Sequence, residues 1–216
     1  MAFGSITALA AEGQTTDIWD GTADTSWYTG HETESEYHIT TAEQLAGLAQ
    51  LINTGTITFE GKTVYLDNDL DLDKREWISI GKGKGGSQAA YSFCGIFDGQ
   101  GHVISNLYSR DSLMPKTNVD DEENCYRQGL FGNVYDGEVK NLGIENADII
   151  VDLNDASTYG KGILVDWLCN SKITNCWTSG SISGGAYLEH YVGGIAGCTL
   201  RNSTLTGCYS TATITG

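Results

Sequence analysis

The clearest pattern in the sequence is an alternation of small or apolar residues with polar ones in two segments, 176–182 and 208–214. A period of two is typical of a β-strand with one buried face. The predicted inward positions are Cys176, Thr178, Gly180 and Ile182, stacked on Cys208, Ser210, Ala212 and Ile214. In this register Trp177 and Tyr209 point outward, side by side.

Four segments that each begin with a glycine repeat along the second half of the chain. They start at Gly95, Gly129, Gly162 and Gly194, which are 34, 33 and 32 residues apart. Such a period is also typical of helical repeats, but the Ser, Thr and β-branched residues of the last two segments favour strands. Stacked coils of this kind form a parallel β-helix, in which each repeat buries its apolar face against its neighbours. We therefore predict an all-β protein in which 95–216 form the repeats.

The N-terminal part of the chain has a different pattern, which predicts a short α-helical cap. Thr40 and Thr41 begin capping-box patterns ahead of apolar residues at helical spacing, and Gly55 can end the helix. Residues 64–73 then alternate as a half-buried strand. A helix over the first coil would cover strand edges that a stack otherwise exposes. We expect 14–94 to form this cap and the first coils, continuous with 95–216.

Composition and charge narrow the class of partner. The chain has 216 residues, of which 28 are Gly and 1 is Pro, a profile typical of strands joined by tight turns. Its formal net charge is −16 and its isoelectric point is about 4.4. Nucleic acids and anionic membranes bind through Lys and Arg, so this acidity argues against both as partners.

The first 13 residues predict where the protein acts. Residues 1–13 are apolar and rich in small side chains, and Ala8 and Ala10 resemble the end of a secretory signal peptide. The basic start of such a signal is missing, so an ordinary chain terminus is the alternative. Later segments do not approach the roughly 20 apolar residues of a membrane span. These features predict a secreted or cell-surface protein without a membrane span.

An aspartate run within residues 64–73 is a candidate metal site. Its members are Asp67, Asp69, Asp71 and Asp73. Carboxylates on one strand face could bind Ca²⁺, which prefers oxygen ligands. The alternative is a solvated strand face, because the ligand spacing of an EF-hand is absent. Calcium is the one cofactor that the sequence suggests.

Cys176 and Cys208 occupy equivalent positions in the last two repeats. Neighbouring strands lie about 4.8 Å apart, a separation that a disulfide tolerates. A ladder of two buried thiols is equally consistent with the pattern. Neither cysteine has an evident histidine partner, so we expect a structural role.

An outward column of residues is the best candidate for a ligand-binding surface. One step after the Asn-Leu pair or its equivalent, the repeats carry Tyr108, Gly143, Trp177 and Tyr209. Aromatic side chains on a rigid sheet can stack on sugar rings or anchor a protein. The alternative is that these rings only brace the sheet or are covered by another segment.

Several short motifs together resemble the GLUG motif of bacterial surface proteins. Those of the second repeat are Gly129-Leu130-Phe131-Gly132, Asp136-Gly137 and Asn141-Leu142-Gly143. Upstream, the segments 37–45, 61–63, 69–72, 77–81 and 97–104 are similar to the region that precedes such repeats. The third and fourth repeats depart from the glycine-aromatic pattern, which puts a motif-specific ligand in doubt there.

The resemblance implies a right-handed β-helix in a secreted or wall-attached protein, of a group often described as adhesins. Similar repeats also accompany an immunoglobulin A peptidase family that carries zinc in a separate domain. The histidines of this chain, His31, His38, His102 and His190, do not form the His-Glu-x-x-His pattern of that zinc site.

The sequence therefore predicts an adhesion or ligand-binding module without catalytic apparatus. A host glycan, glycoprotein or matrix protein is the expected partner, and the chain is expected to be part of a larger polypeptide. The alternatives are a β-helical glycosidase or polysaccharide lyase, which would gather carboxylates on neighbouring strands, and a purely structural spacer.

Overall fold

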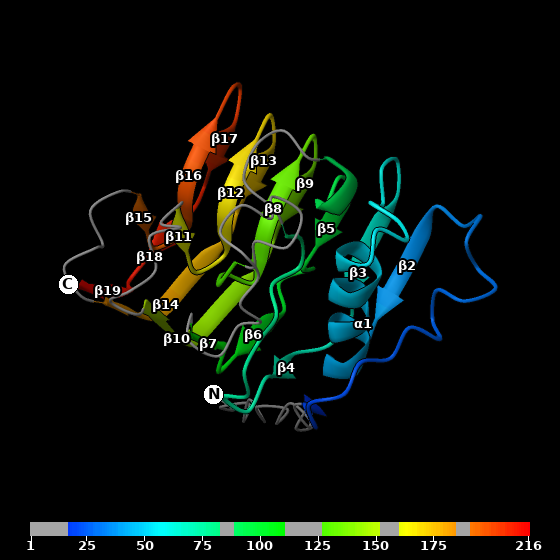
Figure 1. The fold of residues 1–216 in the computed structure, drawn as a ribbon, viewed down its shortest axis with the longest axis horizontal. Helices are drawn as coiled ribbons and strands as arrows, with labels where there is room; N and C mark the ends of the chain where they lie inside the picture. Colours follow the sequence, from blue (N-terminus) through cyan, green and yellow to red (C-terminus); the bar gives the residue numbers. More distant parts are fainter. Residues whose placement is uncertain (1–16, 83–88, 111–126, 152–159, 185–190) are drawn as a thin grey trace, which may run out of the picture.

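The computed structural model describes residues 17–82, 89–110, 127–151, 160–184 and 191–216. The predicted signal remnant at 1–13 lies outside the described residues. The described chain is mostly β-strand with one α-helix, and all its paired strands run parallel (Figure 1). The predicted combination of strands with one short helix is confirmed.

The first sheet contains eight strands drawn from every part of the chain. Its main path follows the order β1-β4-β6-β10-β14-β18, and two further strands pair with β10 and β14. The strands are β1 (Asp17–Ile18), β4 (Leu70–Asp71), β6 (Val103–Ser105), β7 (Tyr108–Arg110), β10 (Gly143–Val151), β14 (Trp177–Gly184), β18 (Tyr209–Ser210) and β19 (Thr213–Thr215).

The second sheet has six strands in the order β17-β13-β9-β5-β3-β2, and the third has three in the order β16-β12-β8. A short pair, β11 (Lys161–Gly162) and β15 (Val192–Gly193), completes the pairing. The strands of the second sheet are β2 (Glu36–Ile39), β3 (Thr63–Leu66), β5 (Ile96–Asp98), β9 (Glu138–Lys140), β13 (Lys172–Thr174) and β17 (Thr204–Thr206). Those of the third sheet are β8 (Phe131–Tyr135), β12 (Val165–Cys169) and β16 (Ala196–Leu200).

Each strand pairs with the equivalent strand of the next repeat. In the last two repeats the predicted register is confirmed, since Trp177 pairs with Tyr209 and Ile182 with Ile214. The side chains of Thr178 and Ile182 are fully buried, as the alternation predicts.

The predicted overlay of the first two repeats is wrong. Ile96 of β5 pairs with Glu138 of β9, whereas the upstream neighbour of Phe131 is Ile80. The Gly132 N–H donates to the Ile80 carbonyl at 2.8 Å. The glycine-aromatic pattern occurs on two different faces of the fold, so glycine spacing alone selects the wrong pair.

In the third and fourth repeats the observed register differs from the predicted one by one residue. Gly162 pairs with Gly193 rather than Gly194, and Val165 pairs with Ala196. The repeats therefore differ slightly in length, and main-chain hydrogen bonds rather than glycine positions determine which residues lie side by side.

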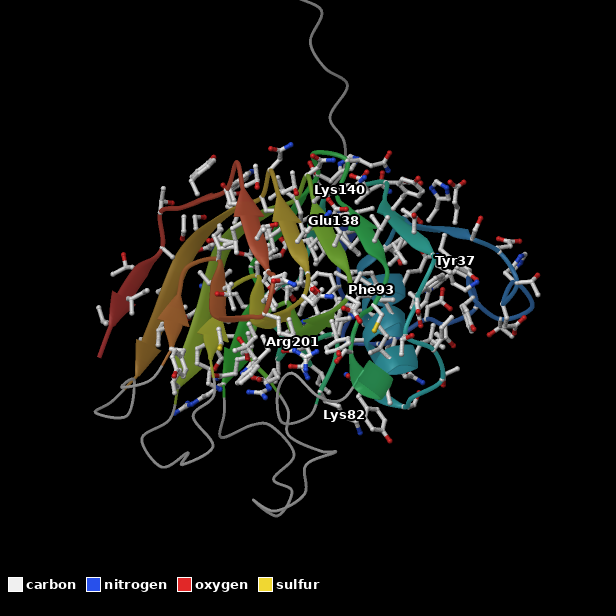
Figure 2. All side chains as sticks on the ribbon, turned by 90° about the horizontal axis from the view of Figure 1, so that it is seen from above. Tyr37, Lys82, Phe93, Glu138, Lys140 and Arg201 are labelled. Carbon is white, nitrogen blue, oxygen red and sulfur yellow. The ribbon has the colours of Figure 1, made fainter. Side chains whose placement is uncertain are left out.

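The core lies between the sheets and is built from stacked apolar side chains. Val64, Phe97, Val139 and Ile173 occupy successive strands of the second sheet and are fully buried. Figure 2 shows Phe93 inside the molecule. Its ring centroid is 5.4 Å from that of Phe131, a spacing typical of favourable aromatic packing.

Asparagine and glycine form the corners between sheets. Between the second and first sheets, Asn141, Asn175 and Gly207 have φ values of 54°, 54° and 67°, in the left-handed region that these residues tolerate best. The Asn141 amide also donates to the Asp98 carboxylate at 3.0 Å. Asn141 and Asn175 therefore form backbone corners and also bond through their side chains to the preceding repeat.

The helix agrees closely with its predicted limits. It is α1 (Ala42–Asn53), and the Thr41 hydroxyl accepts the Gln44 N–H at 3.3 Å while the Gln44 side chain accepts the Thr40 N–H at 2.8 Å. The first bond is the N-cap half of a capping box, and the second binds the N–H of the residue before the N-cap. In Figure 1 the helix lies beyond β8, on the same side of the molecule as the third sheet.

The strand predicted over 64–73 is divided in two. β3 belongs to the second sheet and β4 to the first, so the chain turns a corner between Leu66 and Leu70. Both parts retain the alternation that suggested a single strand, because each continues to bury every second residue.

Candidate ligand-binding surface

Trp177 and Tyr209 form a stacked pair on the outer face of the first sheet. Their ring centroids are 6.3 Å apart and their planes differ by 11°. Trp177 is half-buried, whereas Tyr209 is 59% exposed. The two residues are paired on the neighbouring strands β14 and β18, so their rings pack against each other. The Tyr209 ring is the one exposed to solvent.

Gly143 makes room for this pair. It lies opposite Trp177 in the register of β10 and β14. A Cβ atom at Gly143 would lie 2.5 Å from the indole atom Cε2 of Trp177, which is closer than atoms can pack. The glycine in the predicted column therefore provides the surface on which the indole rests.

Tyr108 does not belong to the predicted column. It pairs with Asp148, and the residue opposite Gly143 is Val103. The equivalent of Asn106 is Asn146, whose side-chain amide donates to the side-chain oxygen Oδ1 of Asn106 at 2.6 Å. The sequence offered two Asn corners for alignment, and the prediction selected the wrong one.

Polar side chains lie beside the aromatic pair. Ser179 and Thr211 follow Trp177 and Tyr209 by two residues and therefore share their face of the sheet. The Ser179 hydroxyl accepts the Asn146 N–H at 3.1 Å and can still donate, and Thr211 is exposed with a hydroxyl that can donate and accept. The surface combines an exposed ring with hydrogen-bonding groups.

The four aspartates of the predicted calcium site are not gathered into a site. They bind separate side chains: Asp67 meets His38 at 2.8 Å, Asp69 meets His102 at 3.0 Å, Asp71 accepts from Asn106 at 2.7 Å, and Asp73 meets Arg75 at 3.3 Å. Within the described ranges, no group of three or more His, Cys, Asp or Glu side chains is placed to bind a metal. The corner between β3 and β4 is the reason, because it separates carboxylates that one strand would have aligned.

Cys176 and Cys208 are free thiols that immediately precede the neighbouring strands β14 and β18. Cys176 is 1% exposed, and burial raises the pKa of its thiol to about 12. Burial likewise raises the pKa of Cys94 to about 11. Cys176 and Cys94 are therefore neutral thiols at physiological pH.

This protonation state predicts slow modification. After reduction, iodoacetamide at pH 8 should label Cys208, which is only partly buried, about tenfold or more faster than Cys176, because only the thiolate reacts. Peptide mass spectrometry of timed samples measures both rates. In denaturant the rates should become similar, and similar rates in the native protein would contradict the prediction. Protection of both residues before reduction would instead identify the predicted disulfide.

The sequence did not predict a buried charged cluster around Asp166. The Asp166 carboxylate on β12 is fully buried and accepts backbone N–H groups of Gln128, Gly129 and Gly162 at 2.9, 3.2 and 2.9 Å. Burial raises its pKa, which the positive charges of Lys161 and Arg127 oppose. The signal in the sequence was one aspartate between apolar residues of a strand.

The parallel repeats, the Asn and Gly corners and the outward aromatic pair define this protein as a repeat domain. It carries the GLUG motif, because residues 189–215 match the family described as the GLUG motif. The match falls on the last repeat, whereas the resemblance in the sequence was strongest in the second.

Two relatives extend the comparison. Over 196 residues the chain is 32% identical to Halomucin of Haloquadratum walsbyi (strain DSM 16790 / HBSQ001), an alignment that covers 87% of this chain and 2% of that protein. A crystal structure of a candidate immunoglobulin A1 protease from Bacteroides ovatus is similar with a TM-score of 0.55 and 25% identity. That similarity covers 82% of this chain and 48% of the other, so the chain spans only part of each relative. Among the helices described here, none has the length and apolar character needed to cross a membrane.

Proposed function

We propose that this chain is a ligand-binding module of a secreted or cell-surface protein and that it folds as a right-handed parallel β-helix. Parallel pairing of equivalent strands in three sheets supports the β-helix. The GLUG motif and the similarity to Halomucin support the surface location.

The stacked pair Trp177 and Tyr209 is the observation that carries the proposed binding function. Tyr209 is exposed and its ring stacks on that of Trp177, so an aromatic face is available to a ligand. Sugar rings present apolar C–H faces that stack on such rings, while their hydroxyls would bond to Ser179 and Thr211. A glycan of a host glycoprotein or matrix protein is the ligand that this surface fits best.

The net charge of the module further restricts the class of glycan that it can bind. A net charge of −16 repels sulfated or uronate-rich glycans over the distance of a Debye length. The ligand is therefore a neutral glycan. Binding should change little with salt, in contrast to electrostatic recognition.

The module acts without catalysis. Each histidine of the described chain lies beside a carboxylate at the surface: His31 beside Glu34, His38 beside Asp67, and His102 beside Asp69. The pairs of His38 and His102 lie at the corner that joins β3 to β4, and the pair of His31 precedes β2. Within the described residues, none of them belongs to a group of three or more His, Cys, Asp or Glu side chains that could bind a metal. A protease activity, such as the one assigned to the Bacteroides ovatus protein, would belong to the remainder of such a chain.

Loss of the aromatic pair should abolish binding. On an array of neutral glycans, the Trp177→Ala/Tyr209→Ala variant should lose about tenfold or more in affinity, since an aromatic anchor typically contributes 1.4 kcal/mol or more. Tyr209→Phe is the matched control, because it keeps the ring face and removes only the hydroxyl. Equal binding by the double variant and the native protein would refute the proposed surface. No glycan binding by the native protein would favour a spacer.

A further inference from the structure

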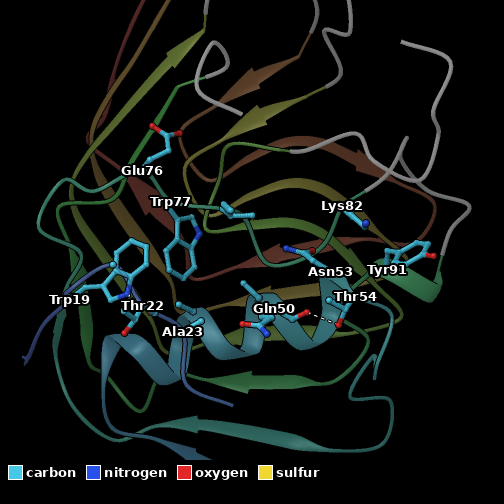
Figure 3. Close-up of a pocket in the computed structure, with 14 residues that line it drawn as sticks. Trp19, Thr22, Ala23, Gln50, Asn53, Thr54, Glu76, Trp77, Lys82 and Tyr91 are labelled. Atoms are coloured by element: carbon cyan, nitrogen blue, oxygen red, sulfur yellow. Dashed lines mark hydrogen bonds between the residues drawn. The ribbon is translucent and has the colours of Figure 1, made fainter. Parts of the chain in front are cut away.

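A cavity of about 590 Å³ lies beside the helix (Figure 3), and neither Trp177 nor Tyr209 lines it. This volume is in the range of small-molecule sites. Its walls come from α1, from the segment around Trp19, from the residues after β4, and from Lys82 and Tyr91. Four separate segments of the N-terminal half thus meet at one hollow.

The face of α1 that lines the cavity carries small and polar side chains, which do not fill it. Ala46 and Ala49 line the cavity together with Gln50 and Asn53, at positions that share one face of a helix. Alanine fills little space there, whereas the leucines and isoleucine of α1 are buried in the core. A leucine at position 49 would occupy part of the cavity.

The walls are held in place by bonds that do not need a ligand. The Trp19 indole N–H donates to the Thr22 carbonyl at 2.7 Å, and the Trp77 indole N–H donates to the Leu130 carbonyl at 3.2 Å. The two indoles pack edge to face with centroids 5.5 Å apart. The Asn53 side chain bonds to the main chain of Ser79 and Gly81. A site held in this way is formed before binding, which reduces the entropic cost of association.

Polar and charged side chains also line the cavity. Figure 3 shows Glu76 and Lys82 on opposite sides, with Gln50 on the helix between them. One Glu76 oxygen accepts the main-chain N–H of Arg110 at 2.9 Å, which orients the carboxylate. The Lys82 ammonium lies 4.9 Å from the centre of the Tyr91 ring. Acceptors and donors are therefore distributed around an apolar base.

From this arrangement we infer that the cavity is a second binding site, and that it takes one neutral sugar unit. A sugar has apolar ring faces and hydroxyl groups on its rim, which match indole and alanine surfaces beneath a carboxylate, an amide and an ammonium. The site is independent of the aromatic pair, because it is built from the helix and the first repeat. The module then binds a glycan at two separated points.

Ligand-observed NMR with methyl glycosides of glucose, galactose, mannose and N-acetylglucosamine tests this site. The intact chain should bind at least one of the four with millimolar affinity, as expected for a single sugar. Ala49→Leu, which fills the cavity, and Glu76→Gln, which keeps the acceptor for Arg110, should each weaken that binding about tenfold or more. Glu60→Gln, at an exposed carboxylate outside the cavity, should leave it unchanged.

The Trp177→Ala/Tyr209→Ala variant separates the two proposals. It should retain the affinity for the methyl glycoside, whatever its effect on glycans of the array. Loss of methyl glycoside binding in this variant, with Ala49→Leu and Glu76→Gln unaffected, would overturn the cavity site and leave the aromatic surface standing. Absence of binding to all four sugars would also overturn it. Circular dichroism checks folding, and Glu76→Gln decides the outcome if Ala49→Leu unfolds.

Discussion

Replacing Asp166 with alanine should lower the free energy of unfolding by about 3–5 kcal/mol, the loss typical when one partner of a buried charge cluster is removed. The substitution would leave three buried N–H groups without their acceptor and would remove the negative charge beside Lys161 and Arg127. Urea denaturation followed by circular dichroism measures the change.

Two controls make this result specific. Asp148→Ala removes a partly exposed aspartate from β10 and should cost less than about 1 kcal/mol. Asp166→Asn keeps one acceptor oxygen and should lie between the native protein and Asp166→Ala. An Asp166→Ala variant that stays within about 1 kcal/mol of the native protein would show that the cluster contributes little.

The pH dependence of the same variants has a definite sign. Burial raises the pKa of Asp166 above its unfolded value of about 3.9, so the folded protein binds this proton more tightly. The contribution of the group is complete below the unfolded pKa and is lost as pH rises through the folded pKa. Between the unfolded and the folded pKa of Asp166, the free energy of unfolding of the native protein should fall as pH rises. Asp166→Asn should remove part of that fall, because asparagine does not titrate.

Gly132→Ala should cost about 3 kcal/mol, because the glycine lies against the main chain of the preceding repeat. A Cβ atom at this position would lie 2.1 Å from the Gly81 carbonyl oxygen and 2.8 Å from the Cβ of Arg127. Accommodation requires a shift of one repeat relative to the next. Thermal unfolding followed by circular dichroism measures the loss.

Gly61→Ala is the matched control for this prediction. A Cβ atom there would meet no other atom within 4 Å, and the cost arises only from a φ of 70°. That cost is about 1–2 kcal/mol. If Gly132→Ala were no more damaging than Gly61→Ala, the close approach to Gly81 would not be what requires glycine in the Gly-Leu-Phe-Gly segment.

Local patterns accounted for the helix and for the strands of the last two repeats. The capping patterns at Thr40 and Thr41 depend on residues three apart, and they predicted the start of α1 to within one residue. The alternation around Trp177 and Tyr209 predicted their outward position and their pairing. Both features arise from the geometry of a few neighbouring residues, which the sequence expresses directly.

Long-range register was harder to predict, and the candidate sites depended on it. Tyr108 was assigned to the aromatic column because Asn106 resembles Asn141, yet hydrogen bonds pair it with Asp148. The carboxylates of Asp67 and Asp71 were placed on one strand, although a corner separates them. The cavity between the helix and Trp77 joins residues from four segments, and no local pattern signals it.

The sequence by itself determined that strands alternate, that a helix begins after Thr40 or Thr41, and that glycine and asparagine recur at intervals near 33 residues. Only the tertiary structure decided which strands lie side by side, that Asp166 is buried among N–H groups, and that small helix residues leave a cavity. The physical reason is that periodicity and capping depend on nearest neighbours along the chain. Register and burial depend on which distant segments exchange main-chain hydrogen bonds.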